Sequence, residues 1–366
     1  MANLTAAEHP ELVLEMTAME RTTPAHYDEW NVRHQQLLDN DKYLNEQFVN
    51  VFSNSAAAHN SIYRGKNLTD VYTVDEICQR ISAGTFEDLY IGDYFDISIT
   101  TSLGGTETVR CVLAGFDIMW NNGDTAFTKH HAVIVPKDCF KTTAKMNDTN
   151  ETTGGYAGSK MHTETLPVYA EALQTALNNH IISHRELLST AATTTGNSNA
   201  GAGYTGYASN WAWSNCLLRL MSEIQVYGST VLSSSFYDTG NANIQFPLFR
   251  LAPNLKVAGI GHNGSRMWYY LSAVVSAAAF ANCNNNGNSN NNSAAGDGGV
   301  RPISCMYTKC RLSADIRYRK GKLDLPKGKE AHLLVEGGWG SILMYPDTSV
   351  GTRNEVKLYE RYGVCI

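Results

Sequence analysis

Hydrophobic residues near the start of the chain follow a helical spacing. In a segment rich in helix formers, large apolar residues recur every seven positions, at Trp30, Leu37, Leu44 and Val51. The positions between them are mixed, with His34, Asp41 and Phe48. A seven-residue apolar repeat is typical of a coiled coil or of a helix packed on a neighbouring subunit. We therefore expect residues 1–60 to be a helical attachment and oligomerisation segment. An amphipathic helix packed on its own domain is the alternative.

Residues 61–305 carry a mixed pattern. Residues 54–61 are expected to be a linker. Residues 73–84 start with Thr, Asp and Glu and end with Gly, which are the two end signals of a helix. Apolar runs predict strands within 89–99, 109–120 and 130–140.

Further along the chain, apolar residues spaced four apart predict a long helix over 166–190. We then expect an exposed loop over 191–207, a short helix over 211–225, and strands near 229–236 and 244–251. Few helices, many short strands and long loops indicate an α+β domain. Residues 306–366 alternate between apolar runs and Gly, which predicts a β-rich C-terminal extension.

Composition excludes several functions. The net charge of −6 argues against general nucleic-acid binding, which needs a basic surface. No apolar run approaches the 18 or so residues that span a membrane, and the N-terminus lacks the basic start of a secretory signal. The chain is thus expected to be made in a host cytoplasm, and its eight scattered cysteines to be ordinary thiols.

The most informative stretch is residues 268–302, which we expect to be a long loop. From Asn282 to Asn292, eight of eleven residues are Asn. Asn tolerates left-handed backbone and both donates and accepts hydrogen bonds, so such a loop can contact many polar surfaces. Bulky residues such as Trp268 and Phe280 frame the tract, whereas a mobile low-complexity loop, the alternative reading, has no need of them.

The residue types in this stretch are also restricted. Between Tyr269 and Val300 there is no Lys, Glu, Gln, Met or Trp. These five types cannot arise from adenine changes in an Asn codon that ends in a pyrimidine. The types that are present, among them Tyr, Ala, Val, Ser, Asp and Gly, all can.

Four sequence patterns in the stretch occur together: WYYLS, Phe-Ala-x-Cys, Asn-x-Asn-Asn-Asn and Gly-Val-Arg-Pro. Together they resemble the variable region of diversity-generating retroelement target proteins, in which a reverse transcriptase writes adenine errors into the gene. Residues 146–161, 180–190 and 226–251 also look like phage structural proteins that end in such a domain. The resemblance covers roughly residues 60–305 and leaves the last 60 residues unexplained.

This resemblance implies a C-type-lectin-like domain, of the formylglycine-generating-enzyme type, that displays variable side chains on a fixed scaffold. The scaffold positions it implies are Trp268, Leu271, Ser272, Phe280, Gly287, Val300, Arg301 and Pro302. The ligand-contacting positions it implies are Tyr269, Tyr270, Val274, Val275, Ala277, Ala278, Asn282, Asn284, Asn286, Asn288, Asn290, Asn291, Asn292 and Asp297.

Motifs for catalysis, metals or cofactors do not emerge. Cys305 and Cys310 are five apart on an expected strand and would face opposite sides. His130 and His131 are adjacent and cannot both face one metal ion, so a structural role is expected. We expect no enzyme, although carboxylates that converge from distant positions would leave a glycan hydrolase open.

We therefore expect a phage virion-surface protein that binds a host-cell receptor, either protein or glycan. It would form a homo-oligomer, with a trimer favoured, and contact other virion proteins but neither nucleic acid nor membrane. A purely structural virion component, such as a head decoration or baseplate protein, is the alternative.

Overall fold

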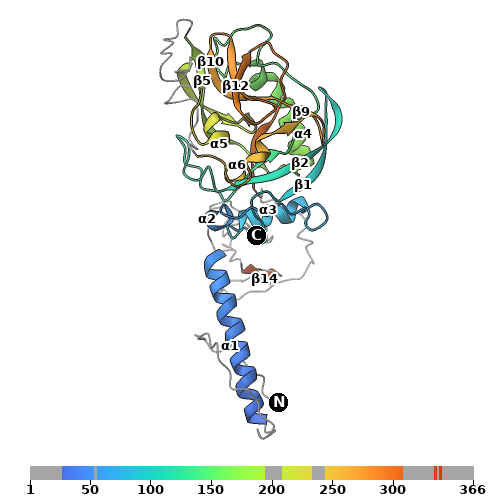
Figure 1. Ribbon diagram of the computed structural model, residues 1–366, viewed down its shortest axis with the longest axis vertical. Coiled ribbons are helices and arrows are strands. Elements are labelled where there is room, and N and C mark those ends of the chain that lie inside the picture. Colours follow the sequence, from blue (N-terminus) through green and yellow to red (C-terminus); the bar gives the residue numbers. More distant parts are fainter. Residues whose placement is uncertain are drawn as a thin grey trace, which may run out of the picture. The chain divides into compact units, whose positions relative to one another are not determined.

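The computed structural model describes residues 27–52, 56–193, 208–232 and 244–307, with two short strands further on (Figure 1). Two compact units divide the chain, Met1–Thr308 and Lys309–Ile366. In the second unit, β14 (Leu334–Val335) pairs antiparallel with β15 (Gly338–Trp339). The rest of the expected β-rich extension, Cys310 included, lies outside the described residues.

The expected N-terminal helix is confirmed as α1 (Tyr27–Phe52). The linker expectation for 54–61 is wrong in part, because α2 (Ala56–His59) forms there. The helix expected over 73–84 is α3 (Val74–Ser82). It begins with a capping box, in which the Thr73 side chain accepts from the Glu76 N–H and the Glu76 carboxylate accepts from the Thr73 N–H.

No described helix is long and apolar enough to cross a membrane.

An antiparallel six-stranded sheet forms the centre of the domain. Its path is β1 (Tyr94–Thr101), β2 (Gly105–Phe116), β3 (Ala132–Pro136), β13 (Pro302–Met306) and β4 (Ile181–Ile182), and β7 (Arg219–Leu220) also pairs with β13. The first three strands were expected, and the mixed α+β class is confirmed. Every residue of β3 and β13 is buried, which places the core around these two central strands.

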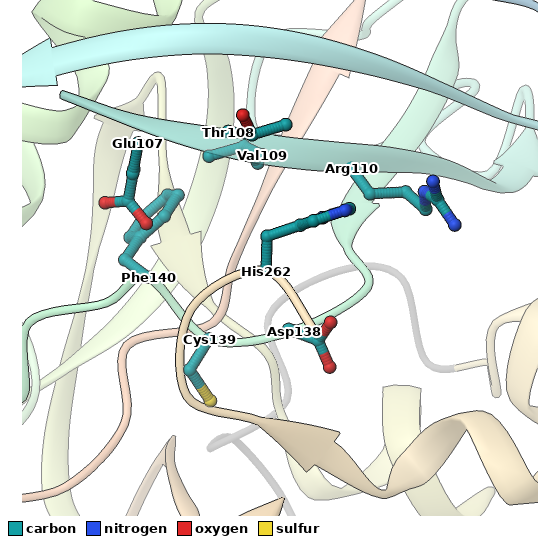
Figure 2. A pocket seen from close by; sticks show the side chains of 8 residues that line it. All are labelled: Glu107, Thr108, Val109, Arg110, Asp138, Cys139, Phe140 and His262. Atoms are coloured by element: carbon teal, nitrogen blue, oxygen red, sulfur yellow. The ribbon is translucent and has the colours of Figure 1, made fainter. Parts of the chain in front are cut away.

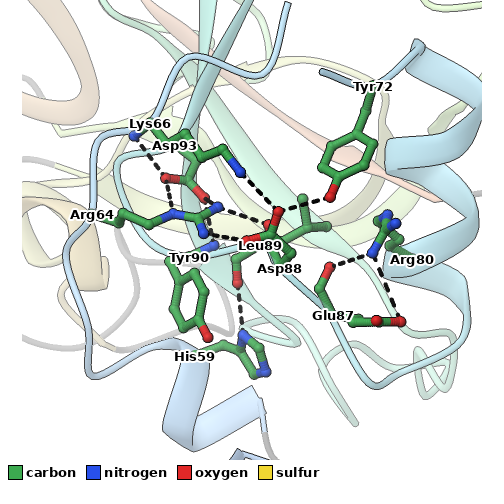
Figure 3. A network of polar contacts seen from close by, with 10 residues as sticks. All are labelled: His59, Arg64, Lys66, Tyr72, Arg80, Glu87, Asp88, Leu89, Tyr90 and Asp93. Atoms are coloured by element: carbon green, nitrogen blue, oxygen red, sulfur yellow. Dashed lines mark hydrogen bonds and ion pairs between the residues drawn. The ribbon is translucent and has the colours of Figure 1, made fainter.

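A polar network ties the segment after α2 to the turn before β1 (Figure 3). Arg64 donates to both carboxylate oxygens of Asp93, at 3.0 and 2.6 Å, and also to Asp88. Lys66 and Tyr72 donate to the other Asp88 oxygen at 2.9 and 2.7 Å. These donors hold the pKa of Asp88 well below its usual range, although burial acts in the opposite direction.

The long helix expected over 166–190 is wrong beyond its first half. The helix α4 (Leu166–Ala176) follows a π-helical turn, η1 (Met161–Thr165), and packs against β1. Asn178 and Asn179 then adopt φ of 50 and 61°, which ends the helix. The chain continues as β4 and β5 (His184–Ala192).

The next expectations also need correction. Where a helix was expected over 211–225, β6 (Ala208–Cys216) pairs with β5, and a single helical turn, α5 (Glu223–Tyr227), follows β7. The expected strand near 244–251 contains α6 (Pro247–Leu251), because Pro247 favours a helix start and donates no ladder hydrogen bond. Residues 194–207 and 233–243 lie outside the described part.

One long excursion of the chain, which itself contributes β4 and β7 to the sheet, separates two neighbouring strands. Strands β3 and β13 are direct neighbours, yet residues 137–301 separate them in sequence. The excursion includes η2 (Pro253–Lys256), the pair β8 (Ala258–Gly259) and β9 (Arg266–Met267), and most of the stretch singled out by the sequence. The C-terminal end of that stretch, Pro302, is therefore held by the central sheet.

Candidate functional site

The stretch expected to be a loop is largely a three-stranded antiparallel sheet. Its strands are β10 (Tyr269–Ser276), β11 (Ala279–Cys283) and β12 (Ser289–Ser293), and β12 is the edge strand. The first seven residues of β10 are buried, so the strand shows no alternation of polar and apolar residues that would reveal it in the sequence.

Two of the expected contact residues, Tyr269 and Tyr270, lie inside the domain with no exposed surface. The Tyr269 hydroxyl donates to the carbonyl of Lys256 at 2.9 Å, and the Tyr270 hydroxyl lies 2.5 and 2.9 Å from the carbonyls of Ser293 and Gly296. Their hydroxyls thus bond within the protein, and a role as surface contacts is wrong for both. The same correction applies to the other buried members of the set, Val274, Val275 and Asn282.

A tight turn built by Asn284 joins β11 to β12. Its side-chain oxygen accepts from the N–H groups of Asn286 and Asn288 at 2.9 and 3.0 Å, and its own N–H donates to the Asn288 carbonyl at 2.9 Å. Gly287 sits in the turn at φ 84°, a conformation that favours glycine. Asn284 is half-buried, and its carbonyl oxygen serves the turn rather than a ligand.

Several side chains of this turn and of β12 reach the solvent. We use the name exposed Asn face for the exposed residues of the turn and of β12: Asn285, Asn286, Asn288, Asn290 and Asn291. Asn290 and Asn291 are neighbours in the strand, so their side chains leave it on opposite sides. Asn285 was missed because the resemblance did not mark it. Among the remaining expected contacts, Asp297 is exposed and Ala277, Ala278 and Asn292 are half-buried.

Asn side chains also close the free edge of β12. The Asn290 side-chain oxygen accepts from the Asn291 N–H at 2.9 Å, and the Asn292 oxygen accepts from the Ser293 N–H at 2.8 Å. In an edge strand alternate N–H groups point away from the sheet and can recruit a foreign strand. The amide NH2 groups of the two Asn residues remain available to a ligand as hydrogen-bond donors.

A second segment, residues 144–152, supports the site. Thr152 donates from its hydroxyl to the Ser276 carbonyl at 2.8 Å and from its N–H to the Ala277 carbonyl at 3.1 Å, which fixes the turn between β10 and β11. The Asn150 side chain accepts from the Ala295 N–H at 3.0 Å. At the start of β12, the Ser289 hydroxyl donates to the buried carboxylate of Glu223, the first residue of α5, at 3.0 Å. The exposed Asn face is therefore carried by a backbone fixed from several directions.

The residues expected as scaffold lie mainly in the interior. Trp268 is half-buried and stands edge-to-face with the Tyr270 ring, and a side chain at Gly298 would collide with its indole. Gly287 lies in the Asn turn. The remaining scaffold positions are buried: Leu271, Ser272, Phe280, Val300, Arg301 and Pro302.

Comparison of the chain with protein-family models, with curated proteins and with solved structures found no match. Function therefore has to be argued from the residues themselves.

A small pocket lies elsewhere in the domain (Figure 2). Its volume is about 10 Å³, roughly the room of one water molecule, and it is lined by residues that include Glu107, Asp138 and His262. Asp138 accepts from the N–H groups of Gly259 and Asn263, at 2.8 and 3.2 Å. One oxygen of Glu107 accepts from the Lys141 N–H at 2.9 Å, and burial raises the pKa of this carboxyl. The pocket is smaller than the roughly 300 Å³ at which small-molecule sites begin.

The residues weighed for catalysis have structural surroundings. His131 is buried: its Nε2 accepts from the Met119 N–H at 2.9 Å, and its Nδ1 donates to the Lys129 carbonyl at 2.8 Å. His130 instead pairs with Asp117 at 2.7 Å. Within the described residues, no group of three or more His, Cys, Asp or Glu side chains is placed to hold a metal ion.

Cys305 is a buried thiol of β13, and all six described cysteines are free, as expected. It lies near a buried polar cluster in which Glu186 is 2.9 Å from His184 and 2.7 Å from Arg219. Burial alone lowers the pKa of His184, but the Cys305 sulfur and the Glu186 carboxylate raise it to about 10. This cluster is enclosed in the core.

Proposed function

We propose that the exposed Asn face is a recognition surface. In this proposal the chain is a virion-surface protein of a phage, and the face binds a receptor on the host cell. One observation carries the proposal: consecutive amide side chains reach the solvent from a turn and an edge strand whose backbone is held by internal hydrogen bonds. A surface fixed before binding loses less conformational entropy on contact.

The chemistry of the face favours a polar ligand. Asn amides donate and accept hydrogen bonds and carry no charge, so they suit glycan hydroxyls and protein main-chain groups alike. Each such contact is weak, and several tethered copies engaging together would strengthen the attachment.

The proposal includes a C-type-lectin-like fold for residues 61–305. Two features support it beyond the general α+β class. The sequence patterns of residues 268–302 resemble variable regions carried by that fold. In addition, the strands of the site form a sheet of their own, β10, β11 and β12, so its exposed residues can change while the central sheet does not.

Deep amplicon sequencing of codons 100–310 in a natural population of this gene tests the proposal. We expect substitutions to concentrate on the exposed Asn face and Asp297, with Leu271, Phe280 and Arg301 fixed. Codons 102–105, an exposed turn between β1 and β2, serve as the control. Variation that is no higher on the face than in the control turn would favour a structural virion component instead.

A binding experiment addresses the same surface directly. The labelled full chain is mixed with bacterial cells from the environment in which the gene was sampled, and the bound fraction is measured. We expect the triple variant Asn288→Ala, Asn290→Ala, Asn291→Ala to lose at least about tenfold in affinity, or roughly 1.4 kcal/mol. The control variant Asn210→Ala, Asn254→Ala changes two exposed Asn residues elsewhere and should bind like the parent. Equal binding by all three proteins would contradict the proposal.

A further inference from the structure

The apolar repeat of α1 lies on an exposed side of that helix. We name as the α1 seam the residues that follow one another at alternating steps of four and three: Trp30, His34, Leu37, Asp41, Leu44 and Phe48. All six are exposed, and the four large apolar side chains are 45–58% exposed. A solvated helix normally turns polar residues outward, so a large apolar stripe on the exposed side indicates an interaction surface.

The spacing of the seam specifies what can cover it. Steps of four and three average 3.5 residues, slightly less than the 3.6 residues of a helical turn. Two such stripes stay in contact only when both helices supercoil around each other and share the same repeat. The next longest described helix of the chain is α4, with 11 residues, and its apolar side chains are already buried in the domain. A second α1 has both the length and the repeat.

Charges along α1 also suit pairing between identical helices. The seam is flanked on one side by Asn31, Leu38 and Asn45, and on the other by Arg33, Asn40 and Gln47. With a single charge among these six, identical copies bring almost no like charges together. The ion pair of Lys42 with Glu46, at 3.5 Å, lies away from the seam.

The area is sufficient for association. The exposed parts of Trp30, Leu37, Leu38, Leu44 and Phe48 provide apolar surface on the order of 500 Å² for each copy. Two copies would then bury on the order of 1,000 Å², which is where specific interfaces begin. An isolated helix in water is only marginally stable, so covering the seam would also stabilise α1 itself.

We propose that α1 binds the α1 helices of further copies of this chain through the α1 seam, in a short coiled coil. His34 and Asp41 set its register. Shifted pairings that place these polar residues against Leu are disfavoured, and in the aligned pairing Asp41 meets a like charge on the other copy, which lowers stability. The two polar positions thus lower stability in exchange for a single alignment.

Sedimentation velocity on the full chain tests the proposal. We expect the parent protein to be an oligomer, and Leu37→Asp with Leu44→Asp to shift it to the monomer mass. Val32→Asp is the matched control, because Val32 is 66% exposed on α1 but lies off the seam. Asp41→Leu should make the oligomer persist at lower protein concentration. Near-UV circular dichroism checks that the domain stays folded in each variant.

A monomeric parent protein at micromolar concentration would overturn the proposal. So would a seam variant that keeps the parent mass, or a control variant that dissociates as fully as the seam variant. The experiment involves no receptor, so its outcome is independent of whether the exposed Asn face binds one.

Discussion

Arg301 donates a hydrogen bond to the hydroxyl oxygen of Tyr269 at 3.1 Å, and both side chains are buried. The other guanidinium donors reach main-chain carbonyls, with Nε at 2.9 Å from Pro136 and Nη2 at 3.0 Å from Leu255. One cation therefore joins the end of β3, the η2 turn and the first residue of β10. These are the end of β3, where the excursion begins, and the start of the strands that carry the candidate site.

Replacing Arg301 by Lys should destabilise the domain strongly. A lysine ammonium cannot reproduce the planar set of donors, so buried carbonyls and the Tyr269 hydroxyl would lose their partner. We expect the free energy of unfolding to fall by about 2–4 kcal/mol. Urea unfolding followed by tryptophan fluorescence measures it. Arg266→Lys, at an exposed position, is the control, and an equal loss in both variants would contradict the role assigned to Arg301.

Two Asn residues of the same turn should respond differently to substitution. Asn284→Ala removes the acceptor of two main-chain N–H groups, and we expect a loss of about 1 kcal/mol. Asn286→Ala removes an exposed side chain and should change stability by less than about 0.5 kcal/mol. Thermal unfolding gives both values, and faster amide exchange at residues 286 and 288 should accompany only the first change. The reverse order would show that the turn does not depend on Asn284.

Acid should weaken the fold through His131. Burial lowers the pKa of His131 to about 4, and its Nε2 must stay unprotonated to accept from the Met119 N–H. Its unfolded pKa is about 6.5, so the folded state takes up the proton later. The stabilisation is complete above pH 6.5 and is lost as pH falls toward 4, by up to about 3 kcal/mol.

His131→Gln tests this assignment, because a Gln side chain can keep one acceptor and one donor but does not titrate. Denaturant unfolding across that pH range should show a shallower decline for the variant than for the parent protein. The decline should not vanish, since burial also lowers the pKa of His162. Equal slopes would rule out His131 as the source.

Glu107 should have the opposite pH dependence. Burial raises its pKa, so the carboxyl favours folding while protonated, and this contribution is lost as pH rises through the folded pKa. Glu107→Gln stays neutral and should raise the melting temperature at pH 7.5 but not at pH 4. Glu151→Gln, at an exposed position, serves as the control. A lower melting temperature of Glu107→Gln at pH 7.5 would mean that the buried charge is stabilised by contacts that the carboxylate alone can make.

The accuracy of the sequence-based predictions depended on how local the determining interactions are. The helix α3 was predicted correctly because its capping box lies within four residues, Thr73 to Glu76. The long helix over 166–190 was wrong because apolar residues continue at spacing four past Ala176. The pair Asn178 and Asn179 was the available sign of its end, since Asn tolerates the left-handed backbone seen there.

In the site, composition marked the correct stretch but could not say which side chains face outward. Tyr269 and Tyr270 are adjacent in a strand, and alternation alone would expose one of them. Both are buried because protein packs on each side of β10, and the pairing of β10 with β11 also contains register shifts. These are properties of the assembled domain and leave no local trace in the sequence.

The closed edge of β12 limits how freely the tract can vary. The side chains of Asn290 and Asn292 each accept a hydrogen bond from the N–H group of the next residue. A Val or Tyr at either position would leave that N–H group without its acceptor, on an edge strand that lies beside the largely buried strand β11. A variant that gained a new ligand in this way would at the same time gain a tendency to adhere to its own copies. If the tract is diversified as proposed, a variant must first stay in solution without associating with its own copies. Only then can it be selected for what it binds.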